Sequence, residues 1–200
     1  MASKSCLSTT ATVVMNLWLR LLWLLATFRM RPRLALPGGA SLLPFRVWFH
    51  DLDTSLHLNN GRYWTLMDLG RTDLVLRSGL WRAILRHRWV PVVNAGTIRF
   101  RREMRLFRTF DLETRILCWR ENWLVMQHRM LMRGRDGTEI VAAVALVRAA
   151  IYDRDAKAYV PVSRLLREIG VAAESPPPSP EVEAFLASEE VLRSAAASER

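Results

Sequence analysis

The chain has 200 residues, half of them hydrophobic, which is enough to bury a core in one domain without disulfide crosslinks. Only two cysteines occur, Cys6 and Cys118, and neither lies in a zinc-binding spacing. A disulfide framework and a structural zinc site are therefore not expected, and a reducing, cytoplasmic setting is favoured. The net charge of +10 comes almost wholly from arginine, with 27 of the 29 basic residues, and it predicts attraction to phosphate groups.

Residues 1–14 are expected to be a disordered leader or an artefact of the assigned start site. Residues 15–36 are predicted to form an apolar helix. The apolar run itself, Val13 to Phe28, contains a single charge, Arg20. This run is too short for the about 20 apolar residues of a membrane-spanning helix. Arg29, Arg31 and Arg33 follow the apolar run, whereas the basic residues of a secretory signal precede it. We expect an amphipathic helix that either packs on protein or lies at a membrane surface with Trp18 and Trp23 inserted.

The next elements are a short strand and a long helix. The apolar run "FRVWF", Phe45 to Phe49, predicts a strand. Asn59 or Asn60 then caps a helix of about five turns, which Gly79 ends.

Four strand-like stretches follow, at residues 90–104, 109–120, 123–133 and 139–152. Short polar joints separate the last three, including an Asp136-Gly137 turn, so they form antiparallel hairpins. The last stretch is apolar on both faces and is expected in the middle of the sheet. The prediction is an α+β domain over residues 44–170, with a strand, a helix and then four strands in a meander.

A unit of this size leaves one sheet face and one strand edge to cover, so we expect a homodimer or a dimer of dimers. Residues 171–180 are proline-rich, which predicts a linker. Residues 181–200 predict a short peripheral helix and a tail.

The segment "HDLDTSLHLNNGRYW", residues 50–64, concentrates acids, histidines and asparagines just before the helix. One interpretation is a helix start that needs capping, in which Asp53 forms an Asx-turn. The other is a reaction centre, because a helix N-terminus offers oriented N–H donors beside a carboxylate that can activate water. A metal site is not expected, because these side chains lie in one irregular turn with no matching distant ligand.

This segment, with "LGRTDLVLRSGL" downstream, resembles the thioesterase branch of the hotdog superfamily. It is similar to 4-hydroxybenzoyl-CoA thioesterase-like and acyl-CoA thioesterase proteins and, over about residues 15–170, to the membrane-tethered thioesterase-like proteins of animals. The resemblance rests on the spacing of seven from Asp53 to Asn60, on Tyr63 three residues later, and on the arginine-rich second strand. It implies a hotdog fold, a long central helix wrapped by an antiparallel sheet, and hydrolysis of acyl thioesters.

The resemblance also implies roles for individual residues. Asp53 matches the acid that acts as nucleophile or general base in the bacterial thioesterases. Asn60 matches the helix position whose backbone N–H faces the thioester carbonyl. Asn59, Asn60 and Tyr63 are accordingly the candidate substrate-binding residues.

A second branch, the plant acyl-carrier-protein thioesterases, shares the pattern D-x-N-x-H-x-N-N-x-x-Y and a later "RREC". On this pattern His57 and Glu103 become candidate acid/base partners. Ser55 replaces the family's asparagine and Met104 replaces its cysteine, which removes a carboxamide and a thiol. The alternatives are that His57 is a loop histidine and that Glu103 belongs to an exposed ladder of ion pairs with neighbouring arginines.

Other enzyme signatures, such as a GxSxG elbow or a phosphate-binding glycine loop, are absent from the sequence, and no cofactor is expected. The stretch "TIRFRREMRLFR" mixes arginine with phenylalanine, but we expect no nucleic acid, because such charges also suit the phosphates of CoA. Two functions remain: a thioesterase acting on acyl-CoA or acyl carrier protein, and a non-catalytic acyl-CoA or lipid-binding module at the inner face of a membrane. A hotdog dehydratase is a weaker third hypothesis.

Overall fold

The computed structural model describes residues 17–198, so the expected leader and Cys6 lie outside the described part. Helix α1, Leu17–Thr27, opens this part and leads into the short 3-10 helix η1, Phe28–Met30. The remaining elements, in chain order, are β1 (Ala40–Arg46), η2 (Phe49–Asp51), α2 (Asn60–Ser78), α3 (Leu80–Arg86), β2 (Trp89–Phe100), β3 (Thr109–Trp119), β4 (Leu124–Arg133), β5 (Glu139–Asp153), β6 (Ala158–Tyr159), α4 (Val162–Arg167) and α5 (Pro180–Ser198).

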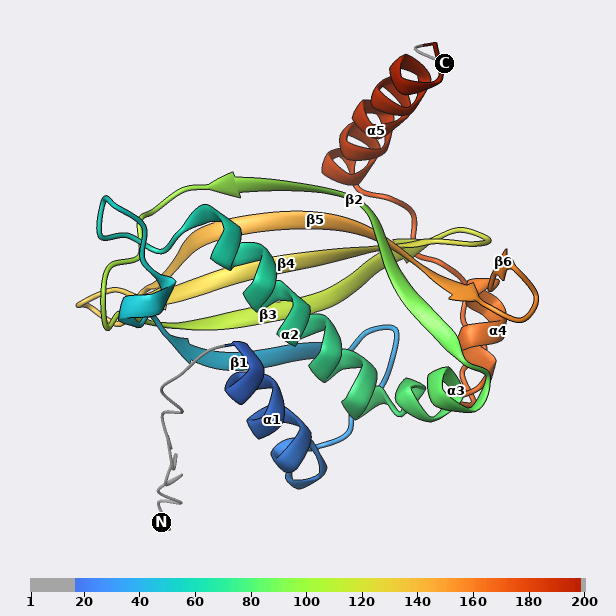
Figure 1. Ribbon diagram of the computed structural model, residues 1–200, viewed down its shortest axis with the longest axis horizontal. Helices are drawn as coiled ribbons and strands as arrows, with labels where there is room; N and C mark the ends of the chain where they lie inside the picture. The colour runs from blue at the N-terminus through green and yellow to red at the C-terminus, as the bar shows by residue number, and fades with distance from the viewer. Residues whose placement is uncertain (1–16, 199–200) are drawn as a thin grey trace.

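The strands form one curved antiparallel sheet in the order β1-β3-β4-β5-β2, with β6 paired to β5. Helix α2 lies across one face of this sheet (Figure 1). The predicted central place of β5 is confirmed, since β4 and β2 flank it. The predicted meander of four strands is wrong for β2, which pairs with β5 and not with the following β3. A strand that is apolar on both faces is typical of the middle of a sheet, where both faces are covered, and here β2 takes the second edge of β5.

The predicted long helix is confirmed in α2, which has 19 residues. Asn59 caps its start by accepting a hydrogen bond from the Gly61 N–H, and Gly79 ends it in the left-handed conformation, with φ of 89°. The face toward the sheet is buried, including Leu66, Met67 and Leu74. Gly70 also lies on this face, where an added methyl group would overlap the Thr114 hydroxyl. Glycine therefore sets how closely α2 approaches β3.

Two local predictions are wrong in their boundaries, and one helix was not predicted. The first strand is Ala40–Arg46, and the end of the predicted Phe45–Phe49 run turns into η2. The second strand ends at Phe100 instead of Met104, because the next two backbone N–H groups both bind the Ala142 carbonyl and the chain leaves the sheet. Beyond Gly79 the chain begins a second helix, α3, that the glycine signal alone did not predict.

Helix α1 packs on the domain, as one of the two interpretations of this segment expected. Leu24 is buried in the core that also contains α2 residues, and Arg20 is buried against Asp51 of η2. The opposite side of α1 is exposed, with Trp18 at 69% and Leu22 at 58%. Across residues 17–198, every helix is too short or too polar to cross a bilayer.

Helix α5 packs on the sheet face opposite α2. Val182 and Phe185 contact Val125 and Leu146, which alternate along their strands with the residues that face α2. A salt bridge of 2.7 Å from Arg148 to Glu189 fastens the middle of the helix. The helix runs from Pro180 to Ser198, close to the residues 181–196 that the sequence predicted, and it projects from the body of the molecule (Figure 1).

Candidate active site

The turn before α2 is organised by Asp53. Its Oδ1 accepts hydrogen bonds from the backbone N–H groups of Ser55 at 2.9 Å and His57 at 3.2 Å. This is the Asx-turn that the sequence offered as the non-catalytic interpretation. Its Oδ2 has no hydrogen-bond donor within residues 17–198. One oxygen therefore fixes the turn, and the other is available to a substrate or a water molecule.

The start of α2 presents one unused backbone donor. Asn59 Oδ1 takes the N–H of Gly61 at 2.8 Å, and the Asn59 carbonyl takes the N–H of Arg62 at 2.9 Å. The backbone N–H of Asn60, the first residue of the helix, has no acceptor in the described part of the chain. It lies at the positive end of the helix dipole, which carries about half a unit charge. An oxyanion is the group that such a donor stabilises.

Tyr63 lies one turn into the helix and is buried, with its ring edge-to-face on Phe100 at a centroid distance of 4.9 Å. Burial, and next the negative charge of Asp53, raise the pKa of Tyr63 to about 12. The phenol is therefore protonated at neutral pH and lies within electrostatic reach of Asp53. It can donate a hydrogen bond at the site but cannot act there as a base.

The loop after β2 brings Glu103 to this turn. The Leu58 N–H bonds the Met104 carbonyl at 2.8 Å, and His57 Nε2 lies 2.9 Å from Glu103 Oε2. Glu103 also accepts from Arg105 Nε at 2.8 Å, so the ion pair that the sequence offered as an alternative is present as well. Met104 is fully buried in the core, so the residue that replaces the plant family's cysteine takes a packing role.

Asp51 is a residue of this region to which sequence reasoning gave no role. It is 1% exposed, and its carboxylate binds Arg20 at 2.7 and 3.2 Å, Arg62 at 3.2 Å and the Trp48 N–H at 3.0 Å. Its backbone carbonyl accepts from the Asn59 N–H at 2.8 Å. Asp51 thus joins α1 to the start of α2. The lone Arg20 in an apolar run was the available signal, since a charge there needs a buried partner.

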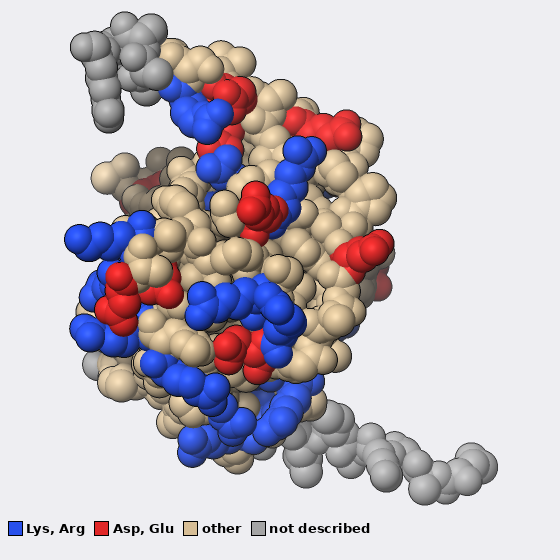
Figure 2. All heavy atoms as spheres, turned by 90° about the vertical axis from the view of Figure 1, so that its right-hand side faces the viewer, with Lys and Arg blue, Asp and Glu red and all other residues tan. Residues whose placement is uncertain are grey.

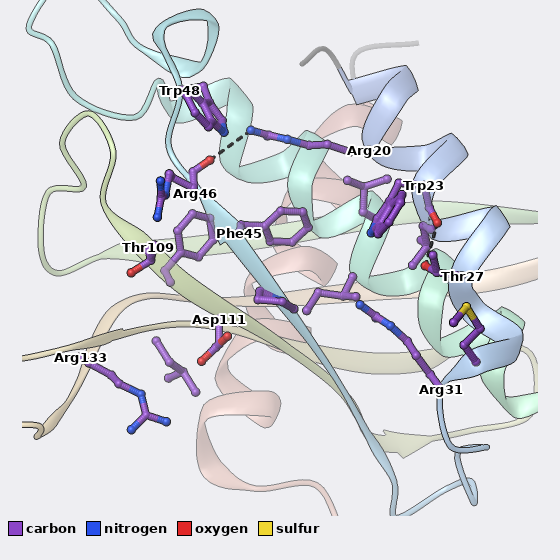
Figure 3. A pocket seen from close by; sticks show the side chains of 17 residues that line it. Arg20, Trp23, Thr27, Arg31, Phe45, Arg46, Trp48, Thr109, Asp111 and Arg133 are labelled. Atoms are coloured by element: carbon purple, nitrogen blue, oxygen red, sulfur yellow. Dashed lines mark hydrogen bonds between the residues drawn. The ribbon is translucent and has the colours of Figure 1, made fainter. Parts of the chain in front are cut away.

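Three cavities of the domain lie away from Asp53, His57, Asn60 and Glu103. One of about 780 Å³ borders α1 and β1, where Trp23 and Thr27 lie on the helix side and Phe45 on the strand side (Figure 3). The same view shows Arg20 donating to the Arg46 carbonyl, a bond of 3.2 Å. Two more, of about 710 and 490 Å³, lie between the helices and the sheet and at the C-terminal end of α2. None of the three is lined by a predicted site residue.

His128 is a core residue, as its position on an apolar strand face predicted. It is fully buried, with Nε2 3.1 Å from Arg71 Nη1 and Nδ1 2.9 Å from Thr114 Oγ1. Because arginine only donates, Nε2 accepts and the Nδ1–H donates to the threonine. Burial, and next the charge of Arg71, lower the pKa of His128 to about 3. This histidine is neutral and holds α2 against the sheet.

Residues 47–186 match the family model described as the Thioesterase-like superfamily. The chain belongs to this superfamily. Among curated relatives, protein THEM6 of Xenopus laevis is 37% identical over 99 residues, which cover 50% of this chain and 46% of that protein. The chain thus spans about half the length of the curated relatives that it matches.

Solved structures show the fold. A 4-hydroxybenzoyl-CoA thioesterase mutant, complexed with 4-hydroxybenzoyl-CoA, superposes with a TM-score of 0.60 at 14% identity, covering 66% of this chain and 99% of that one. The probable thioesterase YbaW of Escherichia coli gives 0.58 at 21% identity, covering 64% and 95%. The domain therefore has the hotdog fold that the resemblance implied, with α2 as its central helix.

Proposed function

We propose that the protein hydrolyses an acyl-CoA thioester to the free acid and CoA, with Asp53 as general base or nucleophile. The observation that carries this proposal is that the segment leading into α2 leaves two groups without a partner within residues 17–198: the Oδ2 of Asp53, whose Oδ1 is held by the turn, and the backbone N–H of Asn60. Acting as a base, Asp53 takes a proton from water as the water oxygen attacks the carbonyl carbon. The Asn60 N–H stabilises the oxyanion, and the C–S bond then breaks as the departing sulfur takes up a proton.

His57 and Glu103 form the second part of the proposed machinery. Their contact of 2.9 Å suits a pair in which the carboxylate orients a protonated imidazole that gives its proton to the leaving sulfur. After product release, Asp53 loses to solvent the proton it took from water, and His57 takes one up from solvent. Asn59 sets the helix start and Tyr63 keeps its proton, so both are proposed to position the substrate. Thioester hydrolysis of this kind requires positioning and a base, and no redox cofactor.

The acyl chain is proposed to enter the apolar cavity between α2, α3 and the sheet. This cavity of about 710 Å³ is lined mostly by aliphatic and aromatic side chains, among them Val75, Ile84 and Met126. It begins near Asp68, eight residues along α2 from Asn60, or about 12 Å at the rise of a helix. We propose that a chain whose thioester lies at the helix N-terminus runs along α2 to this cavity.

We also propose that two copies pair to complete the site. Strand β2 is a sheet edge of 12 residues with β5 as its partner, and its outer residues include the exposed Val93 and Phe100. A long exposed edge of this kind favours pairing with another strand. Phe100 contacts Tyr63, so the same edge ends beside the proposed site. The exposed apolar side of α1 is a further proposed contact, with a membrane surface.

The decisive test is the Asp53→Asn variant. The amide still accepts the two N–H bonds that hold the turn but cannot take a proton, so release of CoA thiol from a panel of acyl-CoAs is expected to fall at least about a hundredfold. The melting temperature and the oligomeric state should stay nearly unchanged. Asp155→Asn, at an exposed site in the β5–β6 turn, is the matched control. Unchanged turnover in Asp53→Asn contradicts the assignment.

The second candidate function is a non-catalytic module that binds acyl-CoA or lipid. The Asx-turn favours it, because a purely structural Asp53 would make the same two hydrogen bonds. Tight binding of acyl-CoA without release of thiol, across the panel of chain lengths, would support this function over hydrolysis.

A further inference from the structure

A basic pocket lies at the C-terminal end of α2, about 27 Å along the helix from Asn60. It has a volume of about 490 Å³, between the coil after η1, the end of α2, α3 and the segment after α4. Its lining carries one acid, Glu168, and six arginines: Arg29, Arg31, Arg33, Arg77, Arg82 and Arg86. Figure 2 faces the end of the molecule that carries α3 and α4, and it shows Lys and Arg gathered over the lower half of that face.

Two of the six arginines build the wall of the pocket. Arg31 and Arg77 bind the fully buried carboxylate of Asp73 at 3.4 and 3.1 Å. The Ser41 hydroxyl donates to the same carboxylate at 2.6 Å, and Arg77 Nε donates to the Pro32 carbonyl at 2.8 Å. These bonds fix the coil against α2, so the pocket is held in shape by the folded core.

The other four arginines are poorly neutralised. Arg86 lies 3.6 Å from Glu168, but this carboxylate is shared with His87 at 3.0 Å. The side chains of Arg29, Arg33 and Arg82 have no carboxylate and no hydrogen-bond acceptor within residues 17–198. The pocket therefore has more positive charge than its own acids balance.

Aromatic rings hold two of these free guanidinium groups. Arg29 Cζ lies 5.5 Å from the Phe28 ring centre, and Arg82 Cζ lies 5.4 Å from that of Trp81. The two rings are themselves edge-to-face at 6.1 Å. A guanidinium that lies over a ring keeps its N–H groups free in its own plane. The rings thus orient the arginines without occupying their hydrogen-bond donors.

We propose that this pocket binds the phosphate group of a phosphate ester or a pyrophosphate. Gathering like charges costs electrostatic free energy, and an anion with two or more negative charges offsets that cost. Planar guanidinium groups match phosphate oxygens two at a time. The volume falls in the range of small-ligand sites, which leaves room for the group that carries the phosphate. A soluble ester and the headgroup of an anionic phospholipid offer the same chemistry.

The test is calorimetric titration of the full chain with pyrophosphate, with no thioester present, so its outcome is independent of the proposed hydrolysis. We expect saturable binding that weakens with added salt. The double variant Arg33→Glu/Arg82→Glu should weaken it at least about tenfold, while Arg33→Lys/Arg82→Lys should retain more of it. Both positions are exposed, so the fold should persist, as circular dichroism can check. Arg135→Glu, on the exposed β4–β5 hairpin, is the matched control.

A second arm identifies the source of the phosphate. Flotation with phosphatidylcholine vesicles, with and without phosphatidylglycerol, measures headgroup binding. Capture that requires phosphatidylglycerol and is lost in the Glu double variant supports a lipid phosphate; pyrophosphate binding without such capture supports a soluble one. The proposal is overturned if neither probe binds, if the Glu double variant binds as the wild type does, or if Arg135→Glu loses binding equally.

Discussion

The link between α1 and the start of α2 can be tested by replacing Arg20 with methionine. The guanidinium makes two hydrogen bonds to Asp51 and one to the Arg46 carbonyl, and both charged side chains are almost completely buried. Methionine fills a similar volume but leaves the carboxylate without its bidentate partner. The variant therefore measures the cost of removing the main partner of a buried carboxylate.

The expected loss follows from the partners that remain. Removing one member of a buried ion pair typically costs about 3–5 kcal/mol. Asp51 would keep Arg62 at 3.2 Å and the Trp48 N–H at 3.0 Å, which places the loss near the low end, at about 3 kcal/mol. For a chain of this length this corresponds to a fall in melting temperature of roughly 6–12 °C.

Urea denaturation followed by circular dichroism measures this loss. Arg102→Met, at an exposed position after β2, is the control and should change the free energy of unfolding by less than about 0.5 kcal/mol. In Arg20→Met/Asp51→Asn the buried carboxylate charge is also removed. The double variant should therefore lose less unfolding free energy than the sum of the losses in Arg20→Met and Asp51→Asn. A loss below about 1 kcal/mol in Arg20→Met would refute the view that this ion pair holds α1 on the domain.

Three more predictions concern the core and the acyl cavity. Because the pKa of His128 falls from 6.5 to about 3 on folding, only the unfolded chain gains a proton between these values, and stability should fall by about 2 kcal/mol from pH 7 to pH 5. Urea unfolding at both pH values should show this loss in the wild type and not in His128→Asn. A folded-state imidazole of His128 that titrates near 6.5 by NMR would contradict the prediction. Gly70→Ala should destabilise by roughly 1–3 kcal/mol in urea, because its methyl group meets the Thr114 hydroxyl, whereas Gly38→Ala has open space and should be neutral. Val75→Phe should narrow the acyl cavity and lower thiol release from long-chain relative to short-chain acyl-CoA by roughly tenfold, and an unchanged ratio would place the chain elsewhere.

The sequence predicted those features that depend on neighbours along the chain. The cap at Asn59, the stop at Gly79 and the hairpin turn at Asp136-Gly137 each follow from the chemistry of a few adjacent residues, and α2, β4 and β5 lie close to their predicted bounds. The Asx-turn of Asp53 was foreseen for the same reason. Its catalytic role stays a prediction.

Contacts between distant segments were decided only by the tertiary structure. The placement of β2 beside β5 depends on how the edges of the whole sheet are satisfied, which no local pattern encodes. Arg20 was visible as an isolated charge, yet its partner Asp51 lies 31 residues away and became identifiable only when both were buried together. The basic pocket likewise combines arginines from η1 and the coil after it, from the end of α2 and from α3. The sequence shows that these residues are charged, but only the fold brings their side chains to one place.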